Sequence, residues 1–192
     1  MPGIAATFCL LLMLGSVFAQ SNNLVKNANG DEGTKFWRVF GNASVSEHAS
    51  LGKRFSINQD AFLFQDIDVP ASTAGMYAVF ISLASIDHLN SNKLGSPYTH
   101  GYFMTAGDLR NASLLANLAG QEMTNPPTTN GEWVKQFGVF RVPEQTGRIR
   151  IFLRGGCGKS ESSVSCVSHF RKPGVFLFGS EEEAKAFVES YE

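Results

Sequence analysis

The side chains best suited to chemistry in this sequence form a group of aromatic and polar residues near its middle. Tyr98, His100 and Tyr102 are spaced two residues apart, so a β-strand would place all three on one face. Aromatic rings beside a few fixed polar groups suit sugars, because a sugar ring has apolar faces and a rim of hydroxyl groups. Three further residues complete the predicted ligand-binding set: Asp87, His88 and Trp133. A place in the hydrophobic core is the open alternative for Tyr102 and Trp133.

Motifs for catalysis are lacking. The sequence contains no Gly-x-Ser-x-Gly nucleophile motif, no His-Glu-x-x-His metal motif and no phosphate-binding loop. Gly155–Ser160 is rich in glycine but lacks the spacing of a nucleotide loop. Asp66 with Asp68, and Asp87 with His88, are conceivable acid–base pairs, yet such neighbours are more often exposed to water. We therefore predict a non-catalytic protein rather than an enzyme.

The first 19 residues have the composition of a signal peptide. Met1–Gln20 carries no charge and contains an apolar block at Phe8–Leu14, followed by small residues where signal peptidase cleaves. The block is shorter than the roughly 20 residues of a membrane span, although an uncleaved anchor is the alternative. We expect residues 1–19 to be removed and residues 20–192 to form one secreted, extracellular domain.

The charge of the chain limits its partners. The formal net charge is −1 at pH 7. A near-neutral surface argues against nucleic acid or an anionic membrane as the main partner. No segment after residue 20 is apolar over the length that membrane insertion needs. Neither nucleic acid nor membrane insertion is therefore expected.

Two features fit an oxidising, glycosylating compartment. Once Cys9 has left with the signal peptide, Cys157 and Cys166 remain, and their spacing suits a disulfide. Two unpaired thiols are the alternative. The sequence also has two acceptor motifs for N-glycosylation, at Asn42 and Asn111.

Alternating apolar residues predict an all-β fold. Two strand-like runs end in Val-Pro, cross a short turn and resume: Phe62–Pro70 leads into Tyr77–Leu83, and Trp133–Pro143 leads into Ile149–Leu153. Proline ends strand pairing and a glycine lets each turn reverse, so we predict a two-sheet antiparallel sandwich.

One helix is expected, at the C-terminus. Ser180 can cap its first turn, and Glu183 stands three residues later, which is a capping box. The apolar residues that follow have helical spacing. The predicted helix spans about residues 181–190.

Three stretches, taken in order, resemble the galactose-binding-like jelly rolls, which include carbohydrate-binding modules and the glycoprotein-reading domain of some F-box proteins. Asn23–Asn27 with Asp31-Glu32-Gly33 and Trp37 is similar to their first strand and turn. Phe64–Pro70 with Gly75-Met76-Tyr77 is similar to their central crossing. Trp133–Leu153 is similar to their late strands. The resemblance covers about residues 23–178 and implies a jelly-roll sandwich.

The resemblance also implies a metal. In many members the first turn and the last strand share a structural calcium, so Asn29, Asp31 and Glu32 are candidate ligands here. The chain departs from the pattern at Arg171 and Lys172, where two cations oppose a metal. A solvated turn without calcium is the alternative, and no other cofactor is expected.

These observations together predict a secreted, lectin-like protein that binds a carbohydrate or a glycoprotein glycan. Two alternatives remain. The first is an extracellular structural or protein-interaction domain without sugar binding. The second is a hydrolase accessory domain that has become free-standing.

Overall fold

The computed structural model describes residues 22–58, 61–88, 95–107, 111–118, 123–156 and 166–192. The predicted signal peptide and Cys157 lie outside these ranges. Within them, the chain forms β1 (Arg38–Phe40), β2 (Ala43–His48), β3 (Gly52–Asn58), β4 (Phe62–Asp68), the 3-10 turn η1 (Ala71–Thr73), β5 (Tyr77–His88), β6 (Tyr98–Thr105), β7 (Leu114–Asn117), β8 (Val134–Arg141), β9 (Thr146–Arg154), β10 (Cys166–Phe178) and α1 (Glu181–Ser190).

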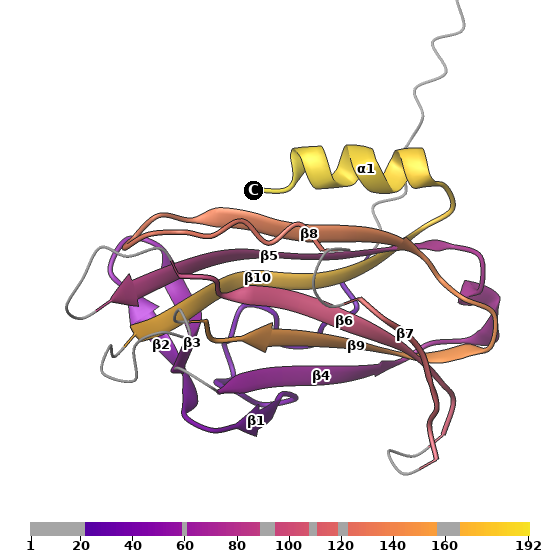
Figure 1. The fold of residues 1–192 in the computed structure, drawn as a ribbon, viewed down its shortest axis with the longest axis horizontal. Helices are drawn as coiled ribbons and strands as arrows, with labels where there is room; N and C mark the ends of the chain where they lie inside the picture. Colours follow the sequence, from indigo (N-terminus) through magenta and orange to yellow (C-terminus); the bar gives the residue numbers. More distant parts are fainter. Residues whose placement is uncertain (1–21, 59–60, 89–94, 108–110, 119–122, 157–165) are drawn as a thin grey trace, which may run out of the picture.

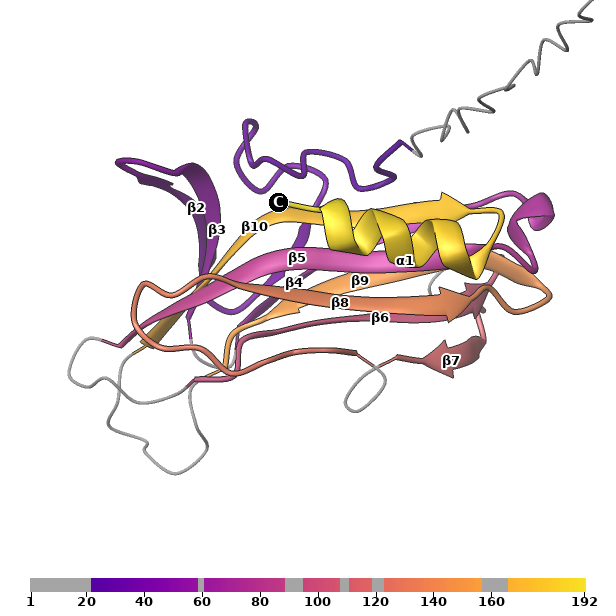
Figure 2. The same ribbon diagram turned by 90° about the horizontal axis from the view of Figure 1, so that it is seen from above.

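The strands form two five-stranded sheets that pack face to face (Figures 1 and 2). Sheet A has the order β1-β4-β9-β6-β7, and sheet B has the order β2-β3-β10-β5-β8. All pairs are antiparallel. Consecutive strands often lie in different sheets, as where β3 of sheet B is followed by β4 of sheet A. This arrangement confirms the predicted all-β jelly-roll sandwich.

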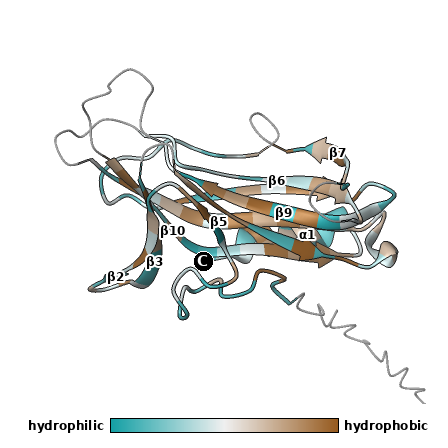
Figure 3. Cartoon of the chain, turned by 90° about the horizontal axis from the view of Figure 1, so that it is seen from below, coloured by the Kyte–Doolittle hydropathy of each residue, from teal (hydrophilic) through white to brown (hydrophobic). Residues whose placement is uncertain are grey.

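The core lies between the sheets, where the inward side chains of alternating strands meet. On β9, Ile149, Ile151 and Leu153 are fully buried. Phe80 of β5 packs edge-on against the ring of Phe103, with the ring centroids 5.9 Å apart. Apolar stretches along the strands appear brown in Figure 3. Burial of this apolar surface is the main stabilising contribution to the sandwich.

The two Val-Pro corners contact each other at one end of the sandwich. The Gly75 amide donates to the Val142 carbonyl at 2.9 Å, and the Val142 amide donates to the Met76 carbonyl at 2.8 Å. The Val69 amide donates to Gly147 at 3.1 Å. Gly75 has a φ of 82°, which favours glycine. The corners that the sequence predicts separately are therefore one structural unit.

The C-terminal helix is confirmed, and it covers the outer side of sheet B (Figure 2). Its first turn is capped as expected, because the Ser180 hydroxyl accepts from the Glu183 amide at 3.2 Å. Ala184 and Val188 are buried against Val79 and Phe176 of the sheet below. The outer face of sheet A has no such cover within the described part of the chain.

The expected first strand is not formed. Residues 23–37 make turns instead. Asn23 nevertheless fixes this segment to β10, because its side-chain amide donates to the Pro173 carbonyl at 3.1 Å and its side-chain oxygen accepts from the Val175 amide at 3.2 Å. Together with the bond from the Leu24 amide to the Val175 carbonyl at 2.9 Å, these side-chain bonds hold the segment beside β10.

Candidate functional site

The outer surface of sheet A carries a continuous group of aromatic side chains, which we call the aromatic face. Its members come from β1, β4, β9 and β6, and their strand neighbours point into the core, because side chains alternate along a strand. Leu63, Leu153 and Phe103, for example, are all buried. The aromatic face consists of Phe40, Phe62, Phe64, Tyr98, His100, Tyr102 and Phe152.

Strand register places these side chains in rows that cross the sheet. One row contains Phe40, Phe62, Arg154 and Tyr98, and the next contains Arg38, Phe64, Phe152 and His100. A third row contains Asp66, Arg150, Tyr102 and Asn117. Opposed residues in antiparallel strands have Cβ atoms about 5 Å apart, which is within reach of ring contact. The register therefore explains why the rings touch.

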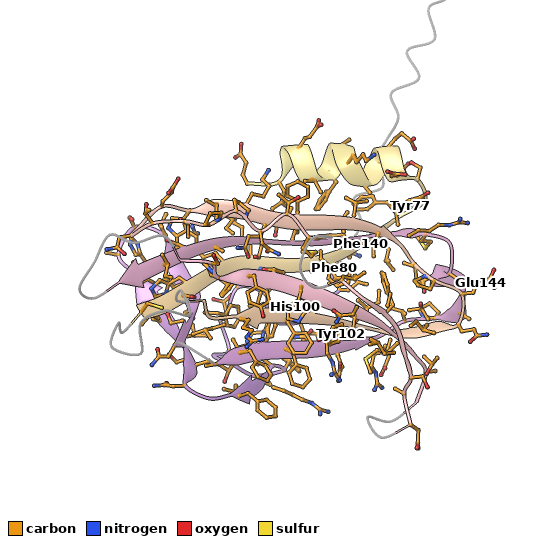
Figure 4. The ribbon with its side chains drawn as sticks, viewed as in Figure 1. Tyr77, Phe80, His100, Tyr102, Phe140 and Glu144 are labelled. Carbon is orange, nitrogen blue, oxygen red and sulfur yellow. The ribbon has the colours of Figure 1, made fainter. Side chains whose placement is uncertain are left out.

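The rings contact one another across the whole face. The His100 imidazole stacks on Phe152, with centroids 4.5 Å apart and planes 6° apart. Phe152 also stacks on Phe64 at 5.2 Å, and Phe40 stacks on Phe62 at 4.8 Å. Figure 4 shows His100 and Tyr102 close together on this side of the sandwich. Such packing limits the rotation of each ring, so the surface is preorganised for a flat partner.

Two ion pairs fix one end of the face. The Arg150 guanidinium donates to both carboxylate oxygens of Asp66, at 2.5 and 2.9 Å, and lies over the Phe64 ring at 4.5 Å. Arg148 lies 2.8 Å from Asp68. The Arg150 pair is bidentate and its side chains are largely buried, a geometry that holds the guanidinium rigidly. Asp66 and Asp68 thus each pair with an arginine, which agrees with the preference for a non-catalytic role of these two carboxylates.

Two other arginines have a different environment. Arg38 and Arg154 are exposed. Arg38 lies over the Phe64 ring and Arg154 over the Tyr98 ring, each at 5.6 Å. Neither has a carboxylate within 4.0 Å among the residues that the structure describes. Both positive charges are thus available to a ligand at the aromatic face.

His100 is uncharged at neutral pH. It is 5% exposed. Burial, and secondarily the positive charge of Arg154, lower the pKa of His100 to about 4. The imidazole therefore acts at pH 7 as a neutral ring in the stack, rather than as a general acid.

The structure brings three of the six predicted ligand-binding residues together on one face. Tyr98, His100 and Tyr102 share the outer face of β6, as their spacing predicts. Trp133 does not lie near them: its half-buried ring contacts Arg171 of β10, in sheet B. Tyr102 is half-buried on the outer face, so it is not a core residue. Sheet membership, which spacing alone does not reveal, separates Trp133 from the tyrosines.

Asp87 also lies in sheet B, where its carboxylate contacts His169, whereas the side chain of the predicted His88 lies outside the described part of the structure. One Asp87 carboxylate oxygen lies 2.9 Å from His169 Nε2, and His169 Nδ1 lies 3.0 Å from the Ser56 hydroxyl. Ser56 in turn contacts the Ser46 hydroxyl at 2.5 Å. Burial, followed by the charge of Arg54, lowers the pKa of His169, although Asp87 acts in the opposite direction. This network provides hydrogen-bond partners for a buried imidazole and joins four strands, which is a structural role.

In the predicted calcium turn several oxygens already have lysine or amide partners, and calcium binding there stays a prediction. Lys53 Nζ lies 3.4 Å from Asp31, and Lys35 forms an ion pair with Glu32. The turn carbonyls of Gly33 and Lys35 accept hydrogen bonds from the Asn27 side-chain amide, at 2.8 and 3.2 Å. Asn29 is exposed beside them. Ammonium and amide donors thus already serve the oxygens that a calcium ion would need.

The remaining predicted residues stay predictions. Cys166 is buried at the start of β10, and its expected disulfide partner Cys157 lies outside the described residues. Asn42 and Asn111 are exposed, as glycan acceptors must be. No helix within the described ranges is long and apolar enough to cross a membrane.

Four rings of the aromatic face were not predicted from the sequence as site residues: Phe40, Phe62, Phe64 and Phe152. A signal was present, because Phe62 and Phe64 share a strand face with Asp66 and Asp68. Since that face is half apolar and half charged, alternation did not show whether it points inward or outward. The pairing of β4 with β9 resolves this, because it places the arginines of β9 opposite the two aspartates.

The layers and the strand order define a jelly-roll sandwich, and solved structures with this fold include carbohydrate-binding modules, as the resemblance in the sequence predicted. The CBM22-1 xylan-binding domain of Xyn10C from Paenibacillus barcinonensis has this fold, with a TM-score of 0.53 and 10% identity over 83% of this chain and 97% of that chain. A xylan-binding domain of CBM 22 matches at a TM-score of 0.50 and 7% identity, over 82% of this chain and 97% of that one.

An enzyme is also among the structural neighbours. The enzymatically active domain of bacteriophage CBA120 tailspike protein 4 matches at a TM-score of 0.54 and 15% identity, over 81% of this chain. This chain covers only 21% of the tailspike chain. At such identities the likeness shows the fold alone. No protein-family model matches the sequence, and no curated protein matches it.

Proposed function

We propose that this protein binds carbohydrate without catalysis and that its ligand lies on the aromatic face. The observation that carries the proposal is the unbroken contact of seven rings across four strands on the uncovered side of sheet A. Structural neighbours of comparable length are named for xylan binding, which supports this choice of ligand class.

The shape of the face suits an extended sugar chain. Phe64 and His100 are buried within the stack and support the rings around them. The exposed Phe40 and the half-buried Phe62, Tyr98, Tyr102 and Phe152 form an apolar surface on which the C–H faces of successive sugar rings can pack. The hydroxyl of Tyr98 and the exposed guanidinium of Arg154 supply hydrogen-bond donors beside the rings. Rigid rings lose little conformational entropy on binding, so even a shallow site can retain affinity.

Secretion is part of the proposal. The predicted signal peptide, the two exposed glycosylation motifs and the predicted disulfide of Cys166 all fit an extracellular protein. A protein in that location meets polysaccharides and glycoproteins. Gel mobility of the secreted protein before and after enzymatic deglycosylation tests the use of Asn42 and Asn111.

One observation favours a second candidate, a protein-interaction role. Phe36, Val39 and Phe40 are exposed at 47%, 39% and 56% on or beside the edge strand β1. An exposed apolar edge strand can pair with an added strand of another protein. In that case Val39→Lys would abolish partner binding, whereas sugar binding would survive.

Affinity electrophoresis of the secreted protein through gels that contain xylan, galactan or β-glucan tests the first candidate. We expect retardation by at least one polymer, and Phe40→Ala and Tyr98→Ala should each weaken it about tenfold, since an aromatic contact contributes on the order of 1 kcal/mol beyond its area. Leu114→Ala is a matched control, because Leu114 is as exposed as Phe40, at 56%, but lies on β7. Equal mobility in all gels, with the fold intact, would refute the proposal.

A further inference from the structure

We infer that the ligand of the aromatic face is an acidic polysaccharide, whose carboxylate or sulfate groups pair with Arg38 and Arg154. This inference rests on the proposed function and adds the charge of the ligand to it. The conclusion follows from the distribution of charge among the rings, which a site for a neutral sugar does not require.

The charged residues of the outer face of sheet A fall into two sets. Arg148 and Arg150 are neutralised by Asp68 and Asp66, and both pairs lie at one end of the strands. Arg38 and Arg154 lie in the two rows that are otherwise aromatic, and no described carboxylate is within 4.0 Å of either. Among the described residues, the aromatic part of the face therefore carries two positive charges without a paired carboxylate.

Both arginines are placed to contact a ligand that rests on the rings. Each guanidinium lies 5.6 Å from a ring centroid, over Phe64 for Arg38 and over Tyr98 for Arg154. Phe64 itself is buried beneath the exposed Arg38 guanidinium, so a ligand there meets the guanidinium rather than the ring. A sugar that contacts the half-buried Tyr98 ring lies beside Arg154. Each guanidinium is a planar donor that can bind a carboxylate or a sulfate in bidentate fashion. His100, the other basic group in these rows, adds no charge at neutral pH.

The separation of the two arginines favours a polymer over a single small anion. Arg154 is two strands and one row away from Arg38. With strands about 4.8 Å apart and a rise of about 3.4 Å per residue, their Cα atoms are roughly 12 Å apart. Two acid groups on one extended chain match this distance, and the stacked rings between them fit the sugars in between.

The test compares polymers that differ in charge. Polygalacturonate and its methyl ester share one backbone, and dextran sulfate and dextran form a second pair in which the acid is a sulfate. Affinity is measured by isothermal titration calorimetry at pH 7 in 20 mM and 300 mM salt. The proteins are the unmodified chain, Arg38→Gln, Arg154→Gln and the double variant. Arg141→Gln, which removes an exposed arginine from β8 in sheet B, is the control.

We expect at least one acidic polymer to bind tenfold or more tightly than its neutral counterpart, with an affinity that falls as salt rises. Each single arginine variant should weaken that binding about 3- to 10-fold at low salt, and the double variant should lose the preference for acid. The control should match the unmodified chain. A preference for one acidic polymer over the other identifies the acid group and supports the inference.

Three results would overturn it. Equal affinity for the acidic and neutral members of both pairs would refute the acidic ligand but leave carbohydrate binding intact. If the double variant still prefers the acidic polymers, cationic residues other than Arg38 and Arg154 cause the preference. Binding to none of the four polymers, nor to the neutral polymers used for the proposed function, would refute both proposals. Circular dichroism of every variant verifies that the fold is retained.

Discussion

The buried imidazole of His100 should make the protein less stable in mild acid. In the unfolded chain a histidine has a pKa near 6.5, whereas burial and Arg154 lower the pKa of folded His100 to about 4. Between these two values the unfolded chain binds a proton that the folded protein excludes. Stability is therefore fully present above pH 6.5 and is lost as the pH falls toward 4, below which both states are protonated.

The expected loss follows from the two pKa values. At pH 4.5 the unfolded His100 is nearly fully protonated and the folded one mostly neutral, which costs about 2 to 3 kcal/mol relative to pH 7.5. Because typical domains are stable by only about 5 to 15 kcal/mol, this loss should be readily measured.

Urea unfolding at pH 7.5 and pH 4.5, followed by tryptophan fluorescence, measures the effect. His100→Phe is the informative variant, because phenylalanine keeps a ring in the stack with Phe152 but cannot titrate. The lowered pKa of His169 contributes to the acid sensitivity of both proteins, so their difference isolates His100. If the variant loses as much stability on acidification as the unmodified chain, the reasoning about His100 is wrong.

Two further predictions concern the fold. Asn27→Ala should lower the free energy of unfolding by about 1 to 2 kcal/mol, because the Gly33 and Lys35 carbonyls lose their hydrogen-bond donor. EDTA should leave the melting temperature of the unmodified chain unchanged. A fall of several degrees with EDTA would show that the turn binds calcium. Gly101→Ala should destabilise the sandwich by about 1 to 3 kcal/mol in chemical denaturation, because the new Cβ would clash with the Phe80 ring. An unchanged denaturation midpoint would show that Phe80 can move aside.

Local signals in the sequence proved reliable where short-range physics controls the structure. The capping box at Ser180 predicted the start of α1, because that hydrogen bond spans three residues. The spacing of Tyr98, His100 and Tyr102 predicted their common face, because alternation is a property of any strand. Their contact with Phe152 did not follow, since β9 is about 50 residues away along the chain and reaches β6 only through sheet pairing.

Long-range pairing also explains the corrections. Asp87 meets His169 across 82 residues, a contact that no local pattern could indicate. Trp133 has the aromatic character of the predicted site but directly precedes β8, which pairs with β5 in sheet B. The turn around Asp31 has the composition of a metal site, yet Lys53 reaches it from β3.

The sequence by itself determined that this chain forms β-strands with one apolar face, that two Val-Pro corners reverse it and that a capped helix follows. Each of these depends on the conformational preferences of neighbouring residues. Only the tertiary structure decided which strands adjoin, and hence that seven rings from four strands meet on one face with Arg38 and Arg154 among them. Strand order is set by the burial of the whole core, which is a property of the complete fold.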